Sequence, residues 1–461
     1  MSRSNLSLPM LPDMSCVVLK SRLRVLGLLP AALLMLVSSA LATKETIILP
    51  FDRTDGMTPL TGFVADKAGN LYGVTSIGGT GNCADFGGGQ GCGLVFELKP
   101  PPKVGGAWTE TVLYNFQGGV DGEEIEANLI IDASGNLYGT TSLGGGGSCT
   151  YGCGTIFELS PPTMKGGEWT KSTLYVFQGG TRDGSYPAAA LVFDSAGNLF
   201  GATQYGGGVN CAGYGCGTVF ELSPPKNGGS WTETVLHTFV GPTNGDAYAP
   251  TCNLIFDSAG NLYGIAGFGG TYNNGAAFEL TPPAAPGDPW TESVIYSFIG
   301  PPDGASPSGG LTWGPNGVLY GTASTWGPHT YGTVFQLSPP ARARSPWTAS
   351  VLHSFNLKAP GGNPGGGVIL DSSGNLYGTT AVGGNYTCVS EFNDGCGVVY
   401  KLEPPLTEGA AWRDLVLHSF TGGSDGVQPE AGLIFGPFGL LYGTAELGGP
   451  SGAGVVFSLV K

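Results

Sequence analysis

Six aspartates recur at nearly fixed spacing, and they are the side chains whose type and pattern most resemble a binding site. Each stands four residues before the start of a repeat, and five of the six are followed directly by glycine. The six are Asp55, Asp121, Asp183, Asp246, Asp303 and Asp425, and Asp246 is the one followed by alanine. Two interpretations stay open. Each aspartate could cap its own backbone in an Asx turn, or together they could form a carboxylate ring that attracts Ca²⁺ or cationic groups. We expect no cofactor, with calcium as the one ion that the ring could take.

Aromatic side chains in the loops are a second candidate for ligand binding. The residues expected to contact a ligand are Tyr151, Tyr214 and Phe392 in cysteine-bearing loops and Trp326 in a short loop, and further aromatics of these loops are Phe86, Tyr205, Tyr331 and Tyr386. Such rings could stack on sugars, or they could form small local cores under glycine-rich loops. The sequence does not separate these alternatives.

Eight of the ten cysteines lie in pairs within four lengthened loops. The pairs are Cys83 with Cys92, Cys149 with Cys153, Cys211 with Cys216 and Cys388 with Cys396. Local disulfides are expected because an exported chain meets oxidising conditions. Structural zinc is the rival interpretation, but it requires about four ligands and each loop offers only two cysteines; the identity of any bound metal stays open. Cys252 aligns with alanines of other repeats and is expected to be a buried thiol.

Evidence for catalysis is weak. His237, His353 and His418 occupy the position that tyrosine holds in other repeats, so they belong to a strand pattern, and only His329 is solitary. No serine or cysteine stands in a recognisable nucleophile motif. The sequence predicts no catalytic residue and favours a role other than catalysis.

Seven copies of a motif such as LIFDSAGNLYG (254–264) organise the chain. Repeats begin near residues 59, 125, 187, 250, 307, 364 and 429. Each motif predicts a short hairpin, a third strand of the VFEL type follows, and most repeats add a Pro-Pro corner and a fourth strand that begins at tryptophan. Seven four-stranded units predict a seven-bladed, all-β propeller of antiparallel strands, in one domain covering residues 43–461.

The two ends of the repeat array are complementary. The last repeat stops after its third strand, and residues 44–51 resemble a fourth strand without a preceding unit, so we expect the N-terminal strand to complete the last blade and close the ring. Small residues precede each inner strand, as the narrow axis requires. The cysteine loops and the aspartates should share one face, with uneven loop heights that favour a groove over the units with short loops, the fourth, fifth and seventh.

Composition and the N-terminal segment indicate the compartment. Residues 1–42 have basic residues, then the apolar run Val25–Val37, then Ala40-Leu41-Ala42, which predicts a cleaved signal peptide and no membrane span after cleavage. The net charge of −15 argues against nucleic acid as a partner. We therefore expect a secreted, periplasmic or cell-surface protein, and a monomer.

The combined unit, with WTETVLY, LIFDSAGNLYG, CGTVFEL and Pro-Pro in order, resembles the GloVer (Gloeobacter/Verrucomicrobia-type) tandem repeat of exported bacterial proteins of the choice-of-anchor class. The resemblance covers nearly all of residues 46–460 and implies an exported propeller of uncharacterised activity, with no catalytic residues to carry over. Relatives often bear a sorting tail, whereas this chain ends at Lys461 within a strand, which favours free secretion or periplasmic residence. We expect a binding or interaction scaffold for extracellular carbohydrate or protein. The alternative is a propeller hydrolase or lyase acting on carbohydrate or lactone through carboxylates at the central mouth.

Overall fold

A computed structural model of the chain describes residues 45–83, 90–208, 210–211, 213–226, 228–242, 245–285, 287–342, 346–357, 361–384, 388, 394–407 and 409–461. The described residues, from Glu45 to Lys461, belong to one compact unit. The predicted signal peptide lies outside the described residues and stays a prediction. No helix long and apolar enough to span a membrane occurs within the described ranges.

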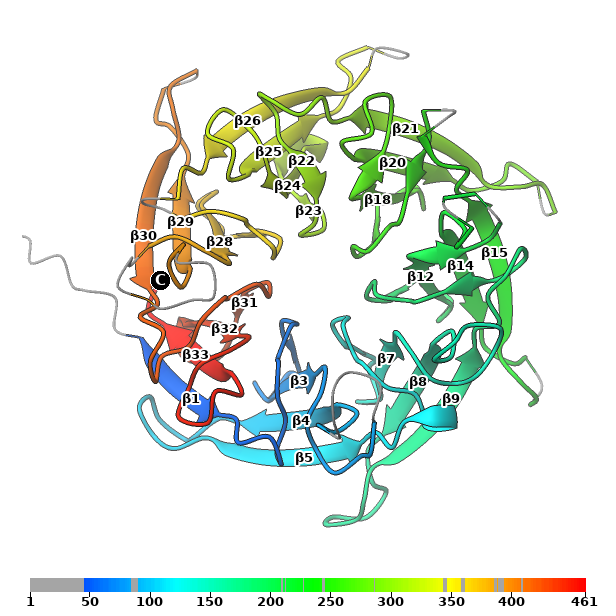
Figure 1. Ribbon diagram of the computed structural model, residues 1–461, viewed down its shortest axis with the longest axis vertical. Helices are drawn as coiled ribbons and strands as arrows, with labels where there is room; N and C mark the ends of the chain where they lie inside the picture. The colour runs from blue at the N-terminus through cyan, green and yellow to red at the C-terminus, as the bar shows by residue number, and fades with distance from the viewer. Residues whose placement is uncertain are drawn as a thin grey trace, which may run out of the picture. The chain divides into compact units, whose positions relative to one another are not determined.

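Seven antiparallel sheets are arranged in a ring around a common axis, as the repeats predicted (Figure 1). The innermost strands are short: β2 (Val64–Ala65), β6 (Ile130–Ile131), β11 (Val192–Phe193), β17 (Ile255–Phe256), β23 (Thr312–Trp313), β27 (Ile369–Leu370) and β31 (Ile434–Phe435). The second strands are β3 (Leu71–Thr75), β7 (Leu137–Thr141), β12 (Leu199–Thr203), β18 (Leu262–Ala266), β24 (Leu319–Thr325), β28 (Leu376–Thr380) and β32 (Leu441–Ala445). Each inner pair is the hairpin that the LIFDSAGNLYG motif predicted.

The two outer positions of each blade carry the longer strands. The third strands are β4 (Leu94–Lys99), β8 (Thr155–Ser160), β14 (Thr218–Ser223), β20 (Ala276–Thr281), β25 (Thr333–Ser338), β29 (Val398–Glu403) and β33 (Val455–Leu459). The outermost strands are β5 (Thr109–Asn115), β9 (Thr170–Val176), β15 (Thr232–Thr238), β21 (Thr291–Ser297), β26 (Thr348–Ser354), β30 (Arg413–Ser419) and β1 (Thr46–Pro50).

The first strand of the described chain completes the last blade. In the seventh sheet the order is β1-β33-β32-β31, and Thr46 pairs with Ser458 in antiparallel register. The predicted closure by the N-terminal strand is confirmed. It removes an open sheet edge, because β33 would otherwise expose unpaired backbone groups at the end of the ring.

Packing between neighbouring blades forms the core. Each second strand is buried along its first five residues. At three blade boundaries, the tryptophan that precedes an outermost strand packs edge-on against the LYG tyrosine of the preceding blade. Trp169 meets Tyr72 in this way, and Trp108 meets Tyr442 across the closure. Phe116 and Phe157 make a second contact of this kind, with ring centroids 5.1 Å apart. Such edge-to-face pairs add to the burial of apolar area, so the blade boundaries hold the ring together.

The loops predicted to share a face do so. In blade 3, the strand β10 (Gly184–Ser185) of the entering loop pairs with β13 (Tyr205–Gly206) of the loop after the second strand. Blade 4 repeats this with β16 (Ala247–Tyr248) and β19 (Phe268–Gly269), blade 5 pairs β22 (Ala305–Pro307) with the end of β24, and blades 1, 2, 6 and 7 have single bridges at the same place. We call this the loop face.

The opposite face carries the uniform turns. Their aspartates accept local hydrogen bonds: Asp257 Oδ1 accepts from the backbone N–H of Ala259 (2.8 Å) and of Asn261 (2.9 Å), and Oδ2 accepts from the Asn261 side chain. Because these carboxylates already accept hydrogen bonds within their own turns, we expect the binding site on the loop face.

Candidate functional site

All four cysteine pairs form disulfides, as predicted: Cys83–Cys92, Cys149–Cys153, Cys211–Cys216 and Cys388–Cys396. Their sulfurs are bonded to one another and do not form the zinc sites that were the rival interpretation. Disulfides are typical of proteins in oxidising compartments.

Each disulfide supports the loop that enters the next blade. The carbonyl oxygen of the second cysteine accepts a hydrogen bond from the backbone N–H of a residue with positive φ: Cys92 from Glu124 (3.3 Å), Cys153 from Tyr186 (3.0 Å), Cys216 from Ala249 (2.9 Å) and Cys396 from Gln428 (3.0 Å). Positive φ is unfavourable for side chains other than glycine. Thr58, Ser306 and Asn363 have positive φ and donate in the same way to loops without a disulfide, so the blade geometry sets this conformation and the disulfides constrain the loops that supply the acceptor.

An aromatic groove of about 350 Å³ lies between the disulfide loops of blades 2 and 3. Its walls include Tyr151, Tyr186, Tyr205 and Tyr214. Ring centroids are 5.9 Å apart for Tyr186 and Tyr205 and 6.0 Å apart for Tyr205 and Tyr214, so three rings form a connected series. Tyr214 is 71% exposed and Tyr151 is 49% exposed. The groove thus presents aromatic faces to solvent between two disulfide-linked loops. It lies between blades 2 and 3, whereas the loop lengths predicted a groove over the blades with short loops.

Carboxyl groups stand beside the inner end of this aromatic groove. Glu126 accepts hydrogen bonds from the hydroxyls of Ser142 (2.9 Å) and Tyr186. Burial raises the pKa of Glu126, and this effect exceeds the lowering of the pKa by the two hydrogen bonds. Burial, with the neighbouring Glu126 and Glu123 carboxylates, raises the pKa of Glu124 to about 7. The Tyr186 hydroxyl thereby connects the aromatic groove to an acidic pair.

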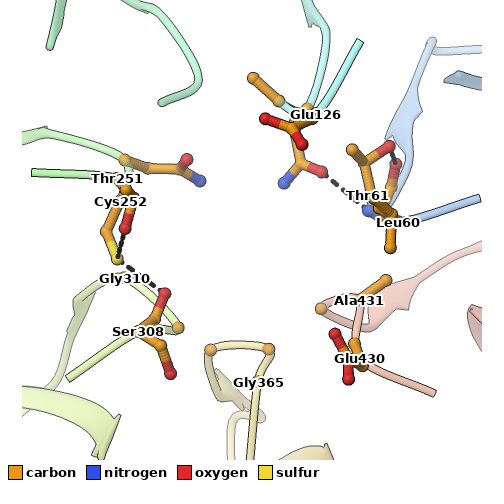
Figure 2. Close-up of a pocket in the computed structure, with 18 of the residues that line it drawn as sticks. Leu60, Thr61, Glu126, Thr251, Cys252, Ser308, Gly310, Gly365, Glu430 and Ala431 are labelled. Carbon is orange, nitrogen blue, oxygen red and sulfur yellow. Dashed lines mark hydrogen bonds between the residues drawn. The ribbon is translucent and has the colours of Figure 1, made fainter. Parts of the chain in front are cut away.

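The axis of the ring holds a polar cavity of about 140 Å³, whose lining is drawn in Figure 2. Glu126 and Glu430 line it together with small residues of the inner strand ends, which include Gly62, Asn128 and Gly432. The Asn128 side-chain oxygen accepts from the backbone N–H of Gly62 (2.7 Å). The small residues expected at the axis are therefore in place, and the cavity mouth is acidic.

A second acidic pair belongs to blade 7. Burial raises the pKa of Glu430, and burial together with the Glu430 carboxylate raises the pKa of Glu446 to about 7. Two protonatable pairs, one from blade 2 and one from blade 7, therefore contribute residues near the axial cavity. Groups whose pKa lies near neutrality can donate or accept a proton at working pH.

Cys252 also lines the axial cavity, and it is the free thiol within the described residues. Its Sγ lies 2.6 Å from the Ser308 carbonyl oxygen, to which the thiol donates. Burial raises the pKa of this thiol to about 11. Cys252 is therefore the small buried thiol that its alignment with alanine predicted.

Family models for the Gloeobacter/Verrucomicrobia repeat match residues 36–251, 83–298 and 250–461. The chain belongs to this family. Solved structures resemble the propeller in fold. One is a Bacteroides uniformis protein assigned provisionally as a 6-phosphogluconolactonase (15% identity, 82% of this chain and 89% of that chain covered, TM-score 0.47). Another is a Dyadobacter fermentans protein of unknown function (11% identity, 81% and 97% covered, TM-score 0.39). No curated protein matches.

The six aspartates of this repeat protein lie in the turns after the outermost strands. Asp183 Oδ2 accepts from the Tyr175 hydroxyl (3.0 Å) and the Gln178 backbone N–H (2.6 Å), and Asp303 accepts from the Tyr296 hydroxyl and the Ile299 backbone N–H. Bonds of this local kind also occupy Asp55, Asp121, Asp246 and Asp425. The turn interpretation therefore accounts for their hydrogen bonds, and calcium binding by the six stays a prediction.

The predicted aromatic residues divide into two groups. Tyr151 and Tyr214 line one groove, whereas Trp326 lies in the loop of blade 5, where its backbone N–H donates to the Thr330 carbonyl (2.9 Å). Phe392 lies outside the described residues. Glu124, Glu126 and Tyr186 were missed by sequence reasoning. The acidic run Glu123-Glu124-Ile125-Glu126, at a place where the other repeats have at most one acidic residue, was the available signal.

Proposed function

We propose that this repeat protein is exported and binds extracellular carbohydrate in the groove of Tyr151, Tyr186, Tyr205 and Tyr214. The observation that carries the proposal is the series of solvent-accessible aromatic rings beside carboxyl groups. A sugar ring has an apolar C–H face, which packs on an aromatic ring, and hydroxyls around its edge, which donate to carboxylates. The groove offers the aromatic faces, and the Glu126 carboxyl group lies behind its wall, hydrogen-bonded to the Tyr186 hydroxyl.

Two features support export to a secreted, periplasmic or cell-surface location. The predicted signal peptide precedes the propeller, and four disulfides cross-link its loops. Disulfides persist outside the reducing cytosol. A protein ligand is the alternative occupant of the loop face, since rigid scaffolds with variable loops also serve as interaction surfaces.

A glycan array followed by titration calorimetry on each bound glycan tests the proposal. We expect Tyr214→Ala and Tyr151→Ala to weaken binding about tenfold each, the loss of about 1.4 kcal/mol of contact free energy. Tyr272→Ala is the matched control, because Tyr272 is 57% exposed on a loop of blade 4 outside the groove. The proposal is wrong if no glycan binds, or if the control variant weakens binding as much as the groove variants do.

A hydrolase or lyase is the second candidate function. The observation in its favour is that Glu126 and Glu430 line the axial cavity, and that burial raises the pKa of their neighbours Glu124 and Glu446 to about 7, a range that suits a general acid or base. Each bound glycan should be incubated with the protein and the products separated by chromatography. Product formation that Glu124→Gln or Glu446→Gln abolishes would establish catalysis, and binding without turnover would exclude it for that glycan.

A further inference from the structure

The boundaries between neighbouring blades contain a second repeated constellation, far along the strands from the axial cavity. Three residues meet at each boundary. The first is the sixth residue of an outermost strand, and the second is the aspartate of the loop that follows this strand. The third is the second residue of the outermost strand in the next blade, or, for β1, the residue directly before the strand. At two boundaries these positions hold histidine, aspartate and glutamate, and in each set the ligand atoms lie within 4.8 Å of one another. The sets are His237, Asp246 and Glu292, and His418, Asp425 and Glu45.

The first set joins blades 3 and 4. His237 lies on β15, Glu292 lies on β21, and His237 Nε2 is 4.0 Å from Asp246 Oδ2. Asp246 is 8% exposed, and its Oδ2 accepts from the Val240 backbone N–H (2.7 Å). Nε2 of His237, Oδ1 of Asp246 and Oε1 of Glu292 are buried without a hydrogen-bond partner among the described residues. Three adjacent unsatisfied polar atoms are costly in a protein interior.

The second set joins blades 6 and 7, where the ring closes. His418 lies on β30, and Glu45 directly precedes β1. His418 Nε2 is 3.5 Å from Asp425 Oδ2 and 3.7 Å from Glu45 Oε2. Nε2 of His418 and Oε1 of Glu45 again lack hydrogen-bond partners in the described part of the chain. Phe420 packs edge-on against the His418 ring, as Phe239 does against His237, with centroids 4.7 Å apart in both cases. The two imidazoles are therefore held in the same way.

These separations suit a small divalent ion better than direct hydrogen bonds. Ligand atoms about 2.1 Å from a tetrahedral zinc ion lie roughly 3.4 Å from one another. Three of the pairs lie 3.5, 3.7 and 4.0 Å apart and the remaining pairs lie within 4.8 Å, so side-chain movements would bring the ligand atoms to that value. One imidazole nitrogen and two carboxylates form a ligand set that zinc accepts, with water in the fourth position.

The boundary between blades 1 and 2 shows that this position accommodates a cation. Here the glutamate position holds Lys171, whose side chain is only 5% exposed. Its ammonium group donates to the carbonyl oxygen of Asp121 (2.6 Å), to Asp121 Oδ1 (2.8 Å) and to the Thr173 hydroxyl (3.1 Å). At this boundary, which has no histidine, the ammonium group of Lys171 therefore lies beside the aspartate at the place proposed for the ion.

We propose that His237, Asp246 and Glu292 form one site for a divalent transition-metal ion such as Zn²⁺, and that His418, Asp425 and Glu45 form a second. Each ion would link the outermost strands of two blades. The ion in the second site would also fix the residue that precedes β1, the strand that closes the ring (Figure 1). The role is structural and independent of the proposed glycan groove.

Metal analysis of the untagged protein, stripped with chelator and equilibrated with micromolar ZnCl₂, tests this proposal. We expect two zinc ions per chain, one in His237→Gln or His418→Gln, and none in the double variant. His353→Gln is the matched control, because His353 holds the same strand position on β26 while the sequence has Pro360 in place of the aspartate; its count should stay at two. A wild-type count of zero, or two ions retained by the double variant, would overturn the proposal and leave only a histidine–carboxylate ion pair.

A gain of binding provides a second arm. The variant Tyr114→His/Lys171→Glu places histidine and glutamate around the existing Asp121 and should raise the count to three. A count of two in this variant, with an unchanged circular dichroism spectrum, would contradict the ligand set.

Hydrogen exchange locates the second ion: zinc should slow amide exchange in Thr46–Pro50 of the wild type and have no such effect in His418→Gln. Equal exchange with and without zinc in the wild type would refute the second site.

Discussion

Lys171→Met should destabilise the propeller far more than Arg413→Met, although the two cations form ion pairs of similar length. Lys171 Nζ lies 2.8 Å from Asp121 Oδ1, with side chains 5% and 19% exposed, whereas Arg413 lies 3.1 Å from Glu403, with side chains 71% and 29% exposed. At an effective dielectric constant of about 20, unit charges 2.8 Å apart attract by about 6 kcal/mol, and desolvation of the ammonium group offsets part of this. The two pairs differ chiefly in burial, although Lys171 also donates to the Asp121 carbonyl and the Thr173 hydroxyl, and Glu403 keeps Lys401 as a second partner.

The magnitude follows from what each variant leaves behind. Removing one partner of a buried pair costs about 3–5 kcal/mol, because the other charge stays buried. Asp121 keeps its hydrogen bonds from the Tyr114 hydroxyl (2.8 Å) and the Gln117 backbone N–H (2.9 Å), so we expect the low end, about 3 kcal/mol, for Lys171→Met. An exposed pair contributes about 0–1 kcal/mol, so Arg413→Met should lose at most about 1 kcal/mol.

Equilibrium urea unfolding, followed by tryptophan fluorescence under oxidising conditions, measures both free energies. Added NaCl should reduce the small Arg413→Met effect and leave most of the Lys171→Met effect, because salt screens exposed charges more than buried ones. Equal losses for the two variants, or a loss below about 1 kcal/mol for Lys171→Met, would refute the reasoning that burial makes Lys171 a structural cation.

Two further predictions concern the loop face. Replacing Cys149 and Cys153 by serine should cost about 2 kcal/mol of stability. It should also weaken glycan binding, because this disulfide constrains the loop that carries Tyr151 and the Cys153 carbonyl, the acceptor of the Tyr186 N–H. The same change at Cys388 and Cys396 should affect stability alone, and equal binding loss in both would contradict this. Between pH 4.5 and 7, folded Glu124 and Glu446 hold protons that the unfolded chain has released, so stability falls as pH rises through this range. The double variant Glu124→Gln/Glu446→Gln should therefore have the same free energy of unfolding as the wild type near pH 4.5 and a higher one at pH 7. The gain should be less than about 1 kcal/mol per group and pH unit, because both sites are partly solvated. If the free energy of unfolding in urea changes with pH equally in the variant and the wild type, this prediction is wrong.

Features confined to one repeat were predictable from the sequence. The seven hairpins, the completing strand at the N-terminus and the small axial residues follow from a pattern repeated seven times. The disulfide pairing was also predictable, because each long loop contains two cysteines and their partners are a few residues apart. In all these cases the interacting residues are neighbours in the chain, or their register is fixed by the regular geometry of the blade.

Contacts between repeats were decided only by the tertiary structure. Tyr186 and Glu126 come from loops of successive blades, and Glu45 and His418 come from opposite ends of the chain. Whether such side chains meet depends on the tilt and twist of adjacent sheets, which the spacing of residues does not specify. In the sequence, the histidines at this strand position therefore look like part of the repeat pattern. In the folded ring, His237 and His418 lie beside carboxylates of the neighbouring blade.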